Sequence, residues 1–577
     1  MPLNVNELPV GSAPRALSFG HFPDRLHAFV WRNWTLVPVK RMAAVLGAPE
    51  NDIAAIAKRM GLGEPPVISE DQWTRTYITI LRRNWHLLPY EQLLQLLEWS
   101  AEKMDYVLRE GDGLFWWFGG CKPVVERLQY TPPLESAISW SEQIGAVVRE
   151  HFPGGVTRVD EPLFGFLQDL LKPVDSKGSV SVHAGGRNTF SPRFCYSYFG
   201  AFREPLSDIE KIYPREYLAR LADTGVDGVW LHEPLFRLAR FPWDATISKE
   251  YEKNAAGLRV LVSRAREFGI GVYLYINEPR PMPMRFFKEH PELKGVDDRG
   301  VLSGQVATLC TSLPEVKDYL RDSIAAVCDA LPDLGGIFTI TASENYTNCW
   351  SHYDGQNCPR CAKRAPEEVI AEVNSLLAEG IAKSKSACQL IVWDWGWKNE
   401  WAEGIIQRLP KSAAFMSVSE WEMPFQRGGV SDQTGEYALS VVGPGPRAQR
   451  NWGFARASGL KTIAKIPGGT TWELGSVPFI PVVETVAKHV ANLRELGIEG
   501  LMMSWTLGGY PCANIEAEIE VGQREERSVD EVLLSVARRR FGEACTPAVV
   551  RAWKRFSAAF QEFPFCGSVL YQSPNHM

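Results

Sequence analysis

The stretch GGIFTITASEN, residues 335–345, decides the fold, because an apolar run in it gives way abruptly to polar residues. Its first part, GGIFTI, shows no polar alternation and is rich in β-branched and aromatic residues, which is typical of a strand buried on both faces. Ser343, Glu344 and Asn345 follow almost at once. We therefore predict a buried parallel strand that places a carboxylate at its carboxyl end.

Similar short apolar runs occur on both sides of this stretch, and segments with helical periodicity separate them. The eight predicted strands are Phe194–Tyr198, Gly228–Leu231, Gly271–Ile276, Gly335–Ile340, Leu390–Asp394, Ala414–Val418, Thr462–Ile466 and Gly500–Trp505. Several of the intervening helices close on a glycine, which can adopt the left-handed conformation of a C-cap. Eight alternating strand and helix units predict an α/β fold, a (β/α)8 TIM barrel, and not an open doubly wound sheet.

The chain is longer than such a barrel needs. It has 577 residues, whereas a barrel of this type takes roughly 250, so we expect further domains. Helical periodicity before the barrel predicts a helical N-terminal domain at residues 1–111, followed by a mixed α/β connecting subdomain at 112–187. The barrel then spans 188–515, and residues 516–577 form a C-terminal helical extension that packs on it.

Composition and charge narrow the class of ligand. The hydrophobic fraction of 45 % and the charged fraction of 23 % are ordinary for a globular protein. A formal net charge of −6 offers no basic patch for nucleic acid or for an anionic membrane. No GxGxxG motif follows the first strand and no Walker A lysine occurs, which argues against nucleotides. The 20 tryptophans suit the apolar faces of sugar rings, so we expect a carbohydrate substrate.

The N-terminal sequence lacks the basic and apolar regions of a secretory signal, and no run of about 18 apolar residues follows it. We therefore expect a cytoplasmic protein that does not contact a membrane. Nothing in the sequence specifies its oligomeric state.

Acidic, polar and aromatic residues follow most of the predicted strands. Active sites of (β/α)8 barrels lie at the carboxyl ends of the strands, so these side chains are expected to meet there. We predict that substrate is bound by His232, Glu233, Asn277, Glu278, Arg280, Asn345, Trp393, Asp394, Trp472 and Trp505. His232 is the only histidine in this set, whereas metal-dependent hydrolases on this fold typically require several.

The same strand ends carry the carboxylates that glycoside hydrolysis needs. One carboxylic acid must protonate the leaving oxygen, and a second carboxylate usually attacks the sugar or activates water. Glu344 directly follows an apolar run and is the predicted acid. Its partner is either Glu473, after the strand that faces the fourth across the barrel, or Glu420, which stands closer to its own strand end. Asp394 is expected to orient the substrate.

Asn277, Glu278 and Pro279 look like the acid/base tripeptide of clan A glycosidases. That tripeptide belongs on the fourth strand, and here it follows the third. We therefore expect Glu278 and Arg280 to bind substrate hydroxyls or to hold neighbouring carboxylates in position, and the alternative is a salt bridge across adjacent loops.

The 11 cysteines are scattered through a large chain, which argues against a disulfide framework. A cluster follows Glu344 in NCWSHYDGQNCPRCAKR, where a CxxC pair can bind one zinc ion from a tight turn. The candidate ligands are Cys349, His352, Cys358 and Cys361, with Cys310 as an alternative fourth ligand. Such a zinc would be structural, with no cofactor for catalysis, and the alternative is that the thiols are free or merely packed.

The motifs GGIFTITASEN, LIVWDWGW and LMMSWTLGGYP resemble the (β/α)8 glycoside hydrolase superfamily, in particular the family 20-like β-N-acetylhexosaminidases and related uncharacterised bacterial proteins. The resemblance covers about residues 190 to 515 and implies hydrolysis of a β-linked N-acetylhexosaminide or related hexoside. Family 20 enzymes place an aspartate immediately before the acid, where it steadies the acetamido group of the substrate. Ser343 stands at that position here, so another carboxylate such as Asp394 would have to take this role.

Two alternatives to a glycosidase stay open at this point. A noncatalytic carbohydrate-binding barrel would keep the tryptophans and not require the carboxylates. A zinc-dependent hydrolase would use an open metal at the cysteine and histidine cluster.

Overall fold

The computed structural model describes residues 3–111, 113–153, 155–156, 165–173, 188–200, 206, 209–298, 305–343, 345–469, 471, 473, 477, 479–505, 508–523 and 527–565. The chain divides into two compact units. The first unit comprises Met1–Asp169 with Asp298–Gln305, and the second comprises Leu170–Asp297 with Val306–Met577. The four-part division expected from the sequence stays a prediction.

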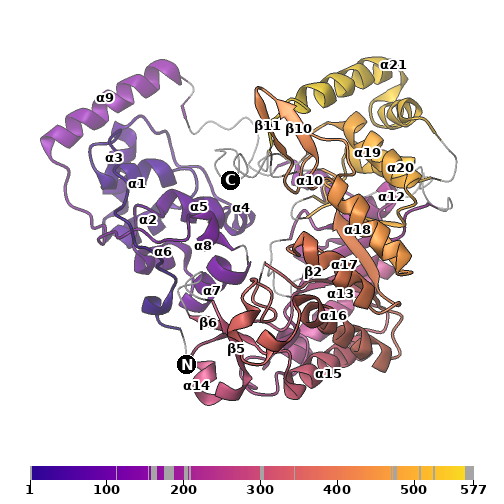
Figure 1. Cartoon of the computed structure of the whole chain (residues 1–577). Helices are drawn as coiled ribbons and strands as arrows, with labels where there is room; N and C mark the ends of the chain where they lie inside the picture. The colour runs from indigo at the N-terminus through magenta and orange to yellow at the C-terminus, as the bar shows by residue number, and fades with distance from the viewer. Residues whose placement is uncertain are drawn as a thin grey trace. The chain divides into compact units, whose positions relative to one another are not determined.

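The first unit is helical, in indigo and purple in Figure 1. Its helices are α1 (Arg25–Asn33), α2 (Val39–Leu46), α3 (Glu50–Arg59), α4 (Glu70–Arg75), α5 (Tyr77–Asn84), α6 (Tyr90–Leu97), α7 (Ala101–Tyr106), α8 (Leu114–Trp117) and α9 (Glu135–His151). Asp24 caps α1 by accepting a hydrogen bond from the backbone N–H of His27 at 2.9 Å. The apolar faces pack into one core, within which the buried amides of Asn33 and Asn84 satisfy each other at 2.9 and 2.7 Å.

The second unit contains a closed barrel of eight parallel strands, so the predicted barrel is confirmed. The strands, in their order around the barrel, are β1 (Arg193–Tyr196), β2 (Gly228–His232), β3 (Gly271–Ile276), β7 (Gly336–Ile340), β8 (Gln389–Trp393), β9 (Ala414–Val418), β12 (Lys461–Lys465) and β13 (Gly500–Met502). All eight match predicted strands. The largest difference lies at the last, which ends at Met502, because Trp505 is apolar but already belongs to the loop above the strand.

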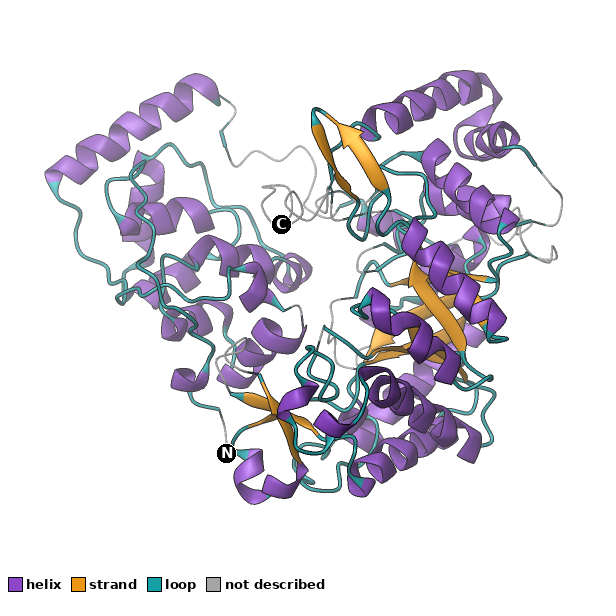
Figure 2. Ribbon diagram, in the orientation of Figure 1, coloured by secondary structure: helices purple, strands orange, loops and turns teal. Residues whose placement is uncertain are grey.

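Helices cover the outside of the barrel, as Figure 2 shows. They are α11 (Ile209–Ile212), α12 (Arg215–Thr224), α13 (Tyr251–Arg266), α15 (Pro314–Ala330), α16 (Pro366–Lys383), α17 (Asn399–Arg408), α18 (Pro446–Ala457), α19 (Val483–Glu495), α20 (Ala513–Val521) and α21 (Val529–Phe560). Two short helices, α10 (Leu167–Leu170) and α14 (Phe286–Glu289), complete the set of α-helices in the described ranges. The predicted C-terminal helices are present, and α21 is two helices joined at Gly542, where φ is 77°.

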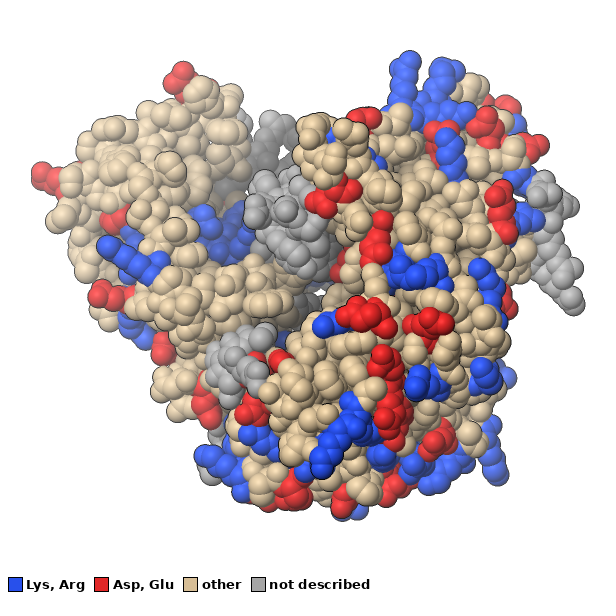
Figure 3. All heavy atoms as spheres, viewed as in Figure 1, with Lys and Arg blue, Asp and Glu red and all other residues tan. Residues whose placement is uncertain are grey.

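Two small sheets extend from the barrel. β4 (Met282–Pro283), β6 (Val306–Leu309) and β5 (Lys294–Asp297) form an antiparallel sheet in that order. β10 (Pro424–Arg427) and β11 (Val430–Gln433) form a hairpin inserted after β9. Acidic and basic side chains are interspersed on the face of the molecule shown in Figure 3. No helix in the described part of the chain is long and apolar enough to cross a membrane.

Aromatic rings fill the interior of the barrel. Phe194 stacks on Tyr273 with ring centroids 4.8 Å apart, and Tyr275 stacks on Phe338 at 5.2 Å. Glycine makes room for them, because a Cβ atom at Gly228 would lie 2.6 Å from Cβ of Phe194 and 2.8 Å from Cε2 of Tyr273. The interior of the barrel is therefore a packed core, and a ligand is expected at the end where the carboxyl ends of the strands meet.

We expect Phe338→Ala to destabilise the barrel unit by about 3–5 kcal/mol, because it leaves a cavity between the rings of the interior. Val260→Ala on the exposed face of α13 should change stability by less than about 0.5 kcal/mol. Urea unfolding followed by tryptophan fluorescence measures both values, and similar losses in the two variants would contradict the packed interior.

Candidate active site

The carboxyl ends of the eight strands meet at one end of the barrel, which has an aromatic floor. We use this term for Trp230, Tyr275, Trp393 and Trp505. The ring of Trp505 lies 4.8 Å from that of Trp230 and 5.3 Å from those of Tyr275 and Trp393. Trp393 is fully buried, and Trp505 is 9 % exposed. The aromatic floor contains two of the three tryptophans predicted to bind substrate, and Trp505 is the more exposed of them, with Trp393 packed against it.

Residues at the ends of β2 and β3 come together beside this floor. Asn277 Oδ1 accepts a hydrogen bond from the Arg280 guanidinium and lies 3.4 Å from His232 Nε2. Asn277 Nδ2 donates to Tyr275 Oη at 3.0 Å. The structure thus groups three of the predicted substrate-binding residues around an aromatic ring of the floor.

Two acidic residues after the same strands, Glu233 and Glu278, form hydrogen bonds or ion pairs within the protein. Glu278 Oε1 accepts from the backbone N–H of Leu235 at 2.7 Å, and Oε2 accepts from that of Arg280 at 2.9 Å. Glu233 lies 3.3 Å from the guanidinium of Arg237. Both carboxylates are buried. These contacts join the loops after β2 and β3, and the substrate-binding roles of Glu233 and Glu278 stay predictions.

The loop after β7 holds the backbone beside the predicted acid. Glu344 and Trp472 lie outside the described residues. Ser343 has a φ of 65°, a left-handed conformation that is strained for serine, and its N–H donates to the carbonyl of Ser351 at 2.6 Å. Asn348 Nδ2 donates to the carbonyl of Thr341 at 2.7 Å.

Asn345, which follows Glu344 and is predicted to bind substrate, is half-buried. Its carbonyl accepts from the N–H of Thr347 at 2.8 Å. The backbone on both sides of the acid is therefore fixed by the loop that follows it.

Asp394, after β8, is buried in an ionic cross-link to α18. Its Oδ2 accepts from Arg447 Nη1 at 2.9 Å, Asn451 Nδ2 at 2.8 Å and Ser417 Oγ at 2.9 Å. Arg447 Nη2 also donates to the carbonyl of Asp394 at 2.9 Å. The predicted role of Asp394 in orienting substrate is not tested by this arrangement, whereas its role in fixing β8 against α18 follows directly from the contacts.

We expect Arg447→Met to destabilise the barrel unit by about 3–5 kcal/mol, because it leaves the Asp394 carboxylate buried without a counter-charge. The matched control is Arg266→Met, which removes an exposed pair with Asp333 and should cost less than about 1 kcal/mol. The measurement is the midpoint of urea unfolding, and equal shifts in both variants would show that the buried pair contributes no more than a surface pair.

Two further carboxylates hold one segment of backbone, residues 437–440. Glu420 Oε1, after β9, accepts from the N–H groups of Tyr437 at 2.6 Å and Ala438 at 3.2 Å. Glu473, after β12, accepts from the N–H groups of Leu439 at 2.7 Å and Ser440 at 3.2 Å. Both side chains are buried, and burial raises the pKa of Glu420 and raises that of Glu473 to about 7. The catalytic roles of Glu420 and Glu473 stay predictions. Their hydrogen bonds fix the backbone of residues 437–440.

Glu436, next to this segment, is a further candidate carboxylate that the sequence analysis did not select. It accepts a hydrogen bond from the indole N–H of Trp395 and is half-buried. Lys465, at the end of β12, interacts electrostatically with Glu436 and Glu420, which raise the pKa of the lysine, although burial outweighs them and lowers it to about 8. The Lys465 ammonium also lies 3.3 Å from the centroid of the Tyr437 ring. Glu436 follows the inserted hairpin and not a barrel strand. Its position in the sequence therefore does not indicate that it lies near the carboxyl ends of the barrel strands.

The raised pKa of Glu473 predicts a pH dependence of stability. Between about pH 4.5 and 7 the native state keeps a proton that the unfolded state has released, so stability falls as pH rises through this window. We expect this loss, roughly 3 kcal/mol at most, to be absent in Glu473→Gln, which carries no charge.

Urea unfolding of both proteins at pH 4.5 and 7.5 measures the difference. The comparison cancels other groups that titrate in the same window. Parallel changes with pH in the two proteins would contradict the assignment.

Four of the five predicted metal ligands form one group. Cys310, Cys349, Cys358 and Cys361 are buried, and their Sγ atoms all lie within 4.8 Å of one another. His352 is not part of this group. Its ring stacks on Tyr346 with centroids 3.7 Å apart. The sequence left Cys310 and His352 as alternatives for the fourth ligand, and the structure brings Cys310 to the other thiols.

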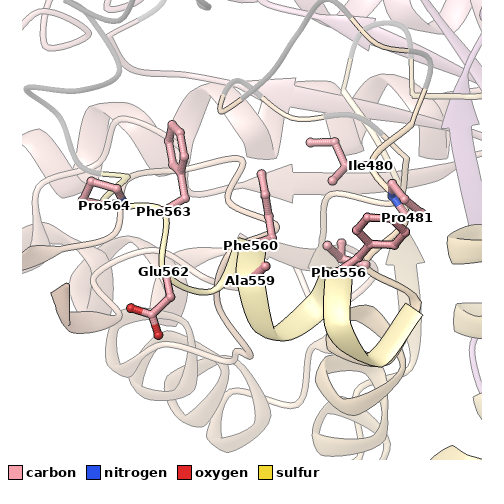
Figure 4. Close-up of a pocket in the computed structure, with 9 residues that line it drawn as sticks. Ile480, Pro481, Phe556, Ala559, Phe560, Glu562, Phe563 and Pro564 are labelled. Atoms are coloured by element: carbon pink, nitrogen blue, oxygen red, sulfur yellow. The ribbon is translucent and has the colours of Figure 1, made fainter. Parts of the chain in front are cut away.

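A pocket of about 430 Å³ lies apart from these residues, between the start of α19 and the end of α21. Figure 4 shows its lining, in which Phe560 lies between Phe563 on one side and Ile480, Pro481 and Phe556 on the other. The lining is almost entirely apolar, and its one charged residue is Glu562. The pocket lacks converging polar groups and does not define a chemical site.

No family model matches the sequence, and no curated protein matches it. The chain is similar in structure to a family GH138 enzyme targeting pectin rhamnogalacturonan II, with a TM-score of 0.43 and 13 % identity over 65 % of this chain and 44 % of that one. It is also similar to a Thermobaculum terrenum O-GlcNAc hydrolase mutant, with a TM-score of 0.39 and 10 % identity over 65 % and 68 % of the two chains. A third, a β-N-acetylhexosaminidase, has a TM-score of 0.38 and 15 % identity over 62 % and 78 %.

These three solved structures are glycoside hydrolases, and this chain spans less than half the length of the first. The assignment of the barrel rests on the order of its own strands.

Proposed function

We propose that the protein is a glycoside hydrolase whose active site lies at the carboxyl ends of the barrel strands. The observation that carries the proposal is the pairing of Glu436 with Trp395 at the end of the barrel that also bears the aromatic floor. An aromatic ring can pack on the C–H face of a sugar, and a carboxylate beside it can reach the glycosidic carbon. The strained Ser343 next to Glu344 supports the proposal, because strained backbone clusters at functional sites.

Glu344 takes the role of general acid in this proposal. A carboxylic acid protonates the leaving oxygen while a second carboxylate attacks the sugar or activates a water molecule. Glu436 is the second carboxylate, since it is half-buried while Glu420 and Glu473 are buried and bound to backbone amides.

Glu420 and Glu473 then act as positioning residues. They fix residues 437–440, and Glu436 directly precedes this segment. A fixed segment reduces the freedom of the catalytic carboxylate before the substrate binds, which lowers the barrier to reaction.

For the substrate we propose a β-linked N-acetylhexosaminide or a related hexoside. This assignment rests on the resemblance of the strand-end motifs, among which Ser343 replaces the aspartate of family 20. Asp394 is paired with Arg447 and is not the carboxylate that we propose for steadying an acetamido group. If the substrate carries such a group, we propose that Glu436 takes this role. The hexoside without an acetamido group needs no such partner.

We expect Glu344→Gln and Glu436→Gln each to lower kcat/KM by about 10²–10⁴-fold, because each removes a group that acts only in the reaction. The loss in Glu344→Gln should be smaller for nitrophenyl glycosides than for sugars with an alkyl leaving group, since a good leaving group needs little protonation. The matched control is Glu403→Gln on the exposed face of α17, which should keep full activity.

The assay uses a panel of nitrophenyl and methyl glycosides. Full turnover in both glutamine variants would overturn the proposal. Sugar binding by calorimetry without turnover in the wild-type protein would instead establish the noncatalytic carbohydrate-binding barrel.

A further inference from the structure

We propose that Cys310, Cys349, Cys358 and Cys361 bind one zinc ion in a closed structural site. This inference does not depend on the proposed hydrolase activity, and the described part of the chain holds all four ligands.

The spacing of the sulfur atoms fits a tetrahedral metal. Cys310 Sγ lies 3.7 Å from Sγ of Cys358 and 3.7 Å from Sγ of Cys361. With Zn–S bonds of about 2.3 Å, the edge of a tetrahedron is about 3.8 Å. A disulfide would bring two sulfur atoms to about 2.0 Å, and these cysteines are all free. These two distances match the edge of such a tetrahedron, and the four sulfur atoms are not bonded to each other.

Polar groups surround the sulfur atoms as they do in thiolate metal sites. Arg360 Nε donates to Cys310 Sγ at 3.2 Å, and Ser312 Oγ lies 3.2 Å from Cys361 Sγ. Four thiolates around Zn²⁺ leave two net negative charges, which an arginine and hydroxyl donors stabilise. A guanidinium aimed at a neutral thiol would gain far less.

The backbone approaches the cluster closely. A Cβ atom at Gly295, in β5, would lie 2.6 Å from Cys349 Sγ and 2.2 Å from Thr308 Oγ1. A side chain at this position would therefore collide with the cluster.

The four cysteines form a small hydrophobic core. Its other buried member is Val296, and Leu313 and Trp350 pack against it. Few apolar side chains stabilise this part of the loop by burial, so a metal ion would add a strong cross-link to it.

The four ligands come from three places along the chain. Cys310 directly follows β6, Cys349 lies in the loop after β7, and Cys358 and Cys361 lie in the turns before α16. A metal here joins the β4–β6–β5 sheet to the loop that follows β7. All four ligand positions are filled by buried thiols, so the ion has no open position for a substrate, which argues against a zinc-dependent hydrolase.

The site has a consequence for catalysis that rests on the proposed function. Asn348, which holds the carbonyl of Thr341, directly precedes Cys349, and Ser351 holds the N–H of Ser343. Removing the ion would loosen the loop that fixes the backbone before Glu344. Zinc loss should therefore lower kcat because the acid is held less firmly in its position, although its carboxyl group is still present.

Metal content of the purified full-length chain tests the site. We expect about one zinc per chain by mass spectrometry, released in step with modification of four thiols by a mercurial reagent. Cys358→Ser should lose most of the zinc and unfold at lower temperature. The matched control, Cys545→Ser, changes an exposed cysteine on α21 and should keep both zinc and stability.

Three outcomes would overturn the proposal. In the first, wild-type protein produced with added zinc contains almost no zinc. In the second, Cys358→Ser and wild type contain equal amounts of zinc. In the third, the wild-type protein contains one iron per chain in place of zinc. Wild-type metal content needs no folded variant, so the test holds even if Cys358→Ser fails to fold. Glu344→Gln should retain its zinc, so failure of the metal site can be told from failure of the proposed activity.

Discussion

The barrel unit depends on one packing constraint, the fit of the Tyr273 ring against glycines at the starts of neighbouring strands. A Cβ atom at Gly336 would lie 2.8 Å from Cδ1 of this ring, and one at Gly228 would lie 2.8 Å from Cε2. Because these positions carry no side chain, rings can fill the interior in successive layers up to Trp505. The packing that stabilises the barrel thus also provides the surface on which a ligand can rest.

Above the aromatic layers the structure uses buried carboxylates to hold backbone. Asp394 fixes β8 against α18, and Glu420 and Glu473 together bind four consecutive N–H groups. A buried carboxylate is stable only when donors replace the lost water, and backbone amides do so at fixed positions. Asp394, Glu420 and Glu473 are therefore buried and shape the loops, whereas Glu436 is half-buried.

The fold could be predicted from the sequence because strands buried on both faces are written as apolar runs, as in GGIFTI. The roles of the acids could not, because the partners of Glu473 lie 34 and 33 residues away in the chain and leave no local pattern. Glu436 follows an inserted hairpin, so a search for polar residues directly after the barrel strands does not find it. The CxxC pair was visible in the sequence, whereas the choice between Cys310 and His352 needed the tertiary structure, since Cys310 precedes Cys349 by a whole barrel strand and helix.

The aromatic floor gives this protein an optical property of its own. The indole rings of Trp230 and Trp393 lie 4.8 and 5.3 Å from that of Trp505, and excitation energy is expected to pass between rings this close. Any sugar that displaces water from Trp505 would change the polarity around these rings. Binding of a ligand at this end of the barrel would then shift the tryptophan fluorescence of the protein, and the shift could be measured without a label and without turnover.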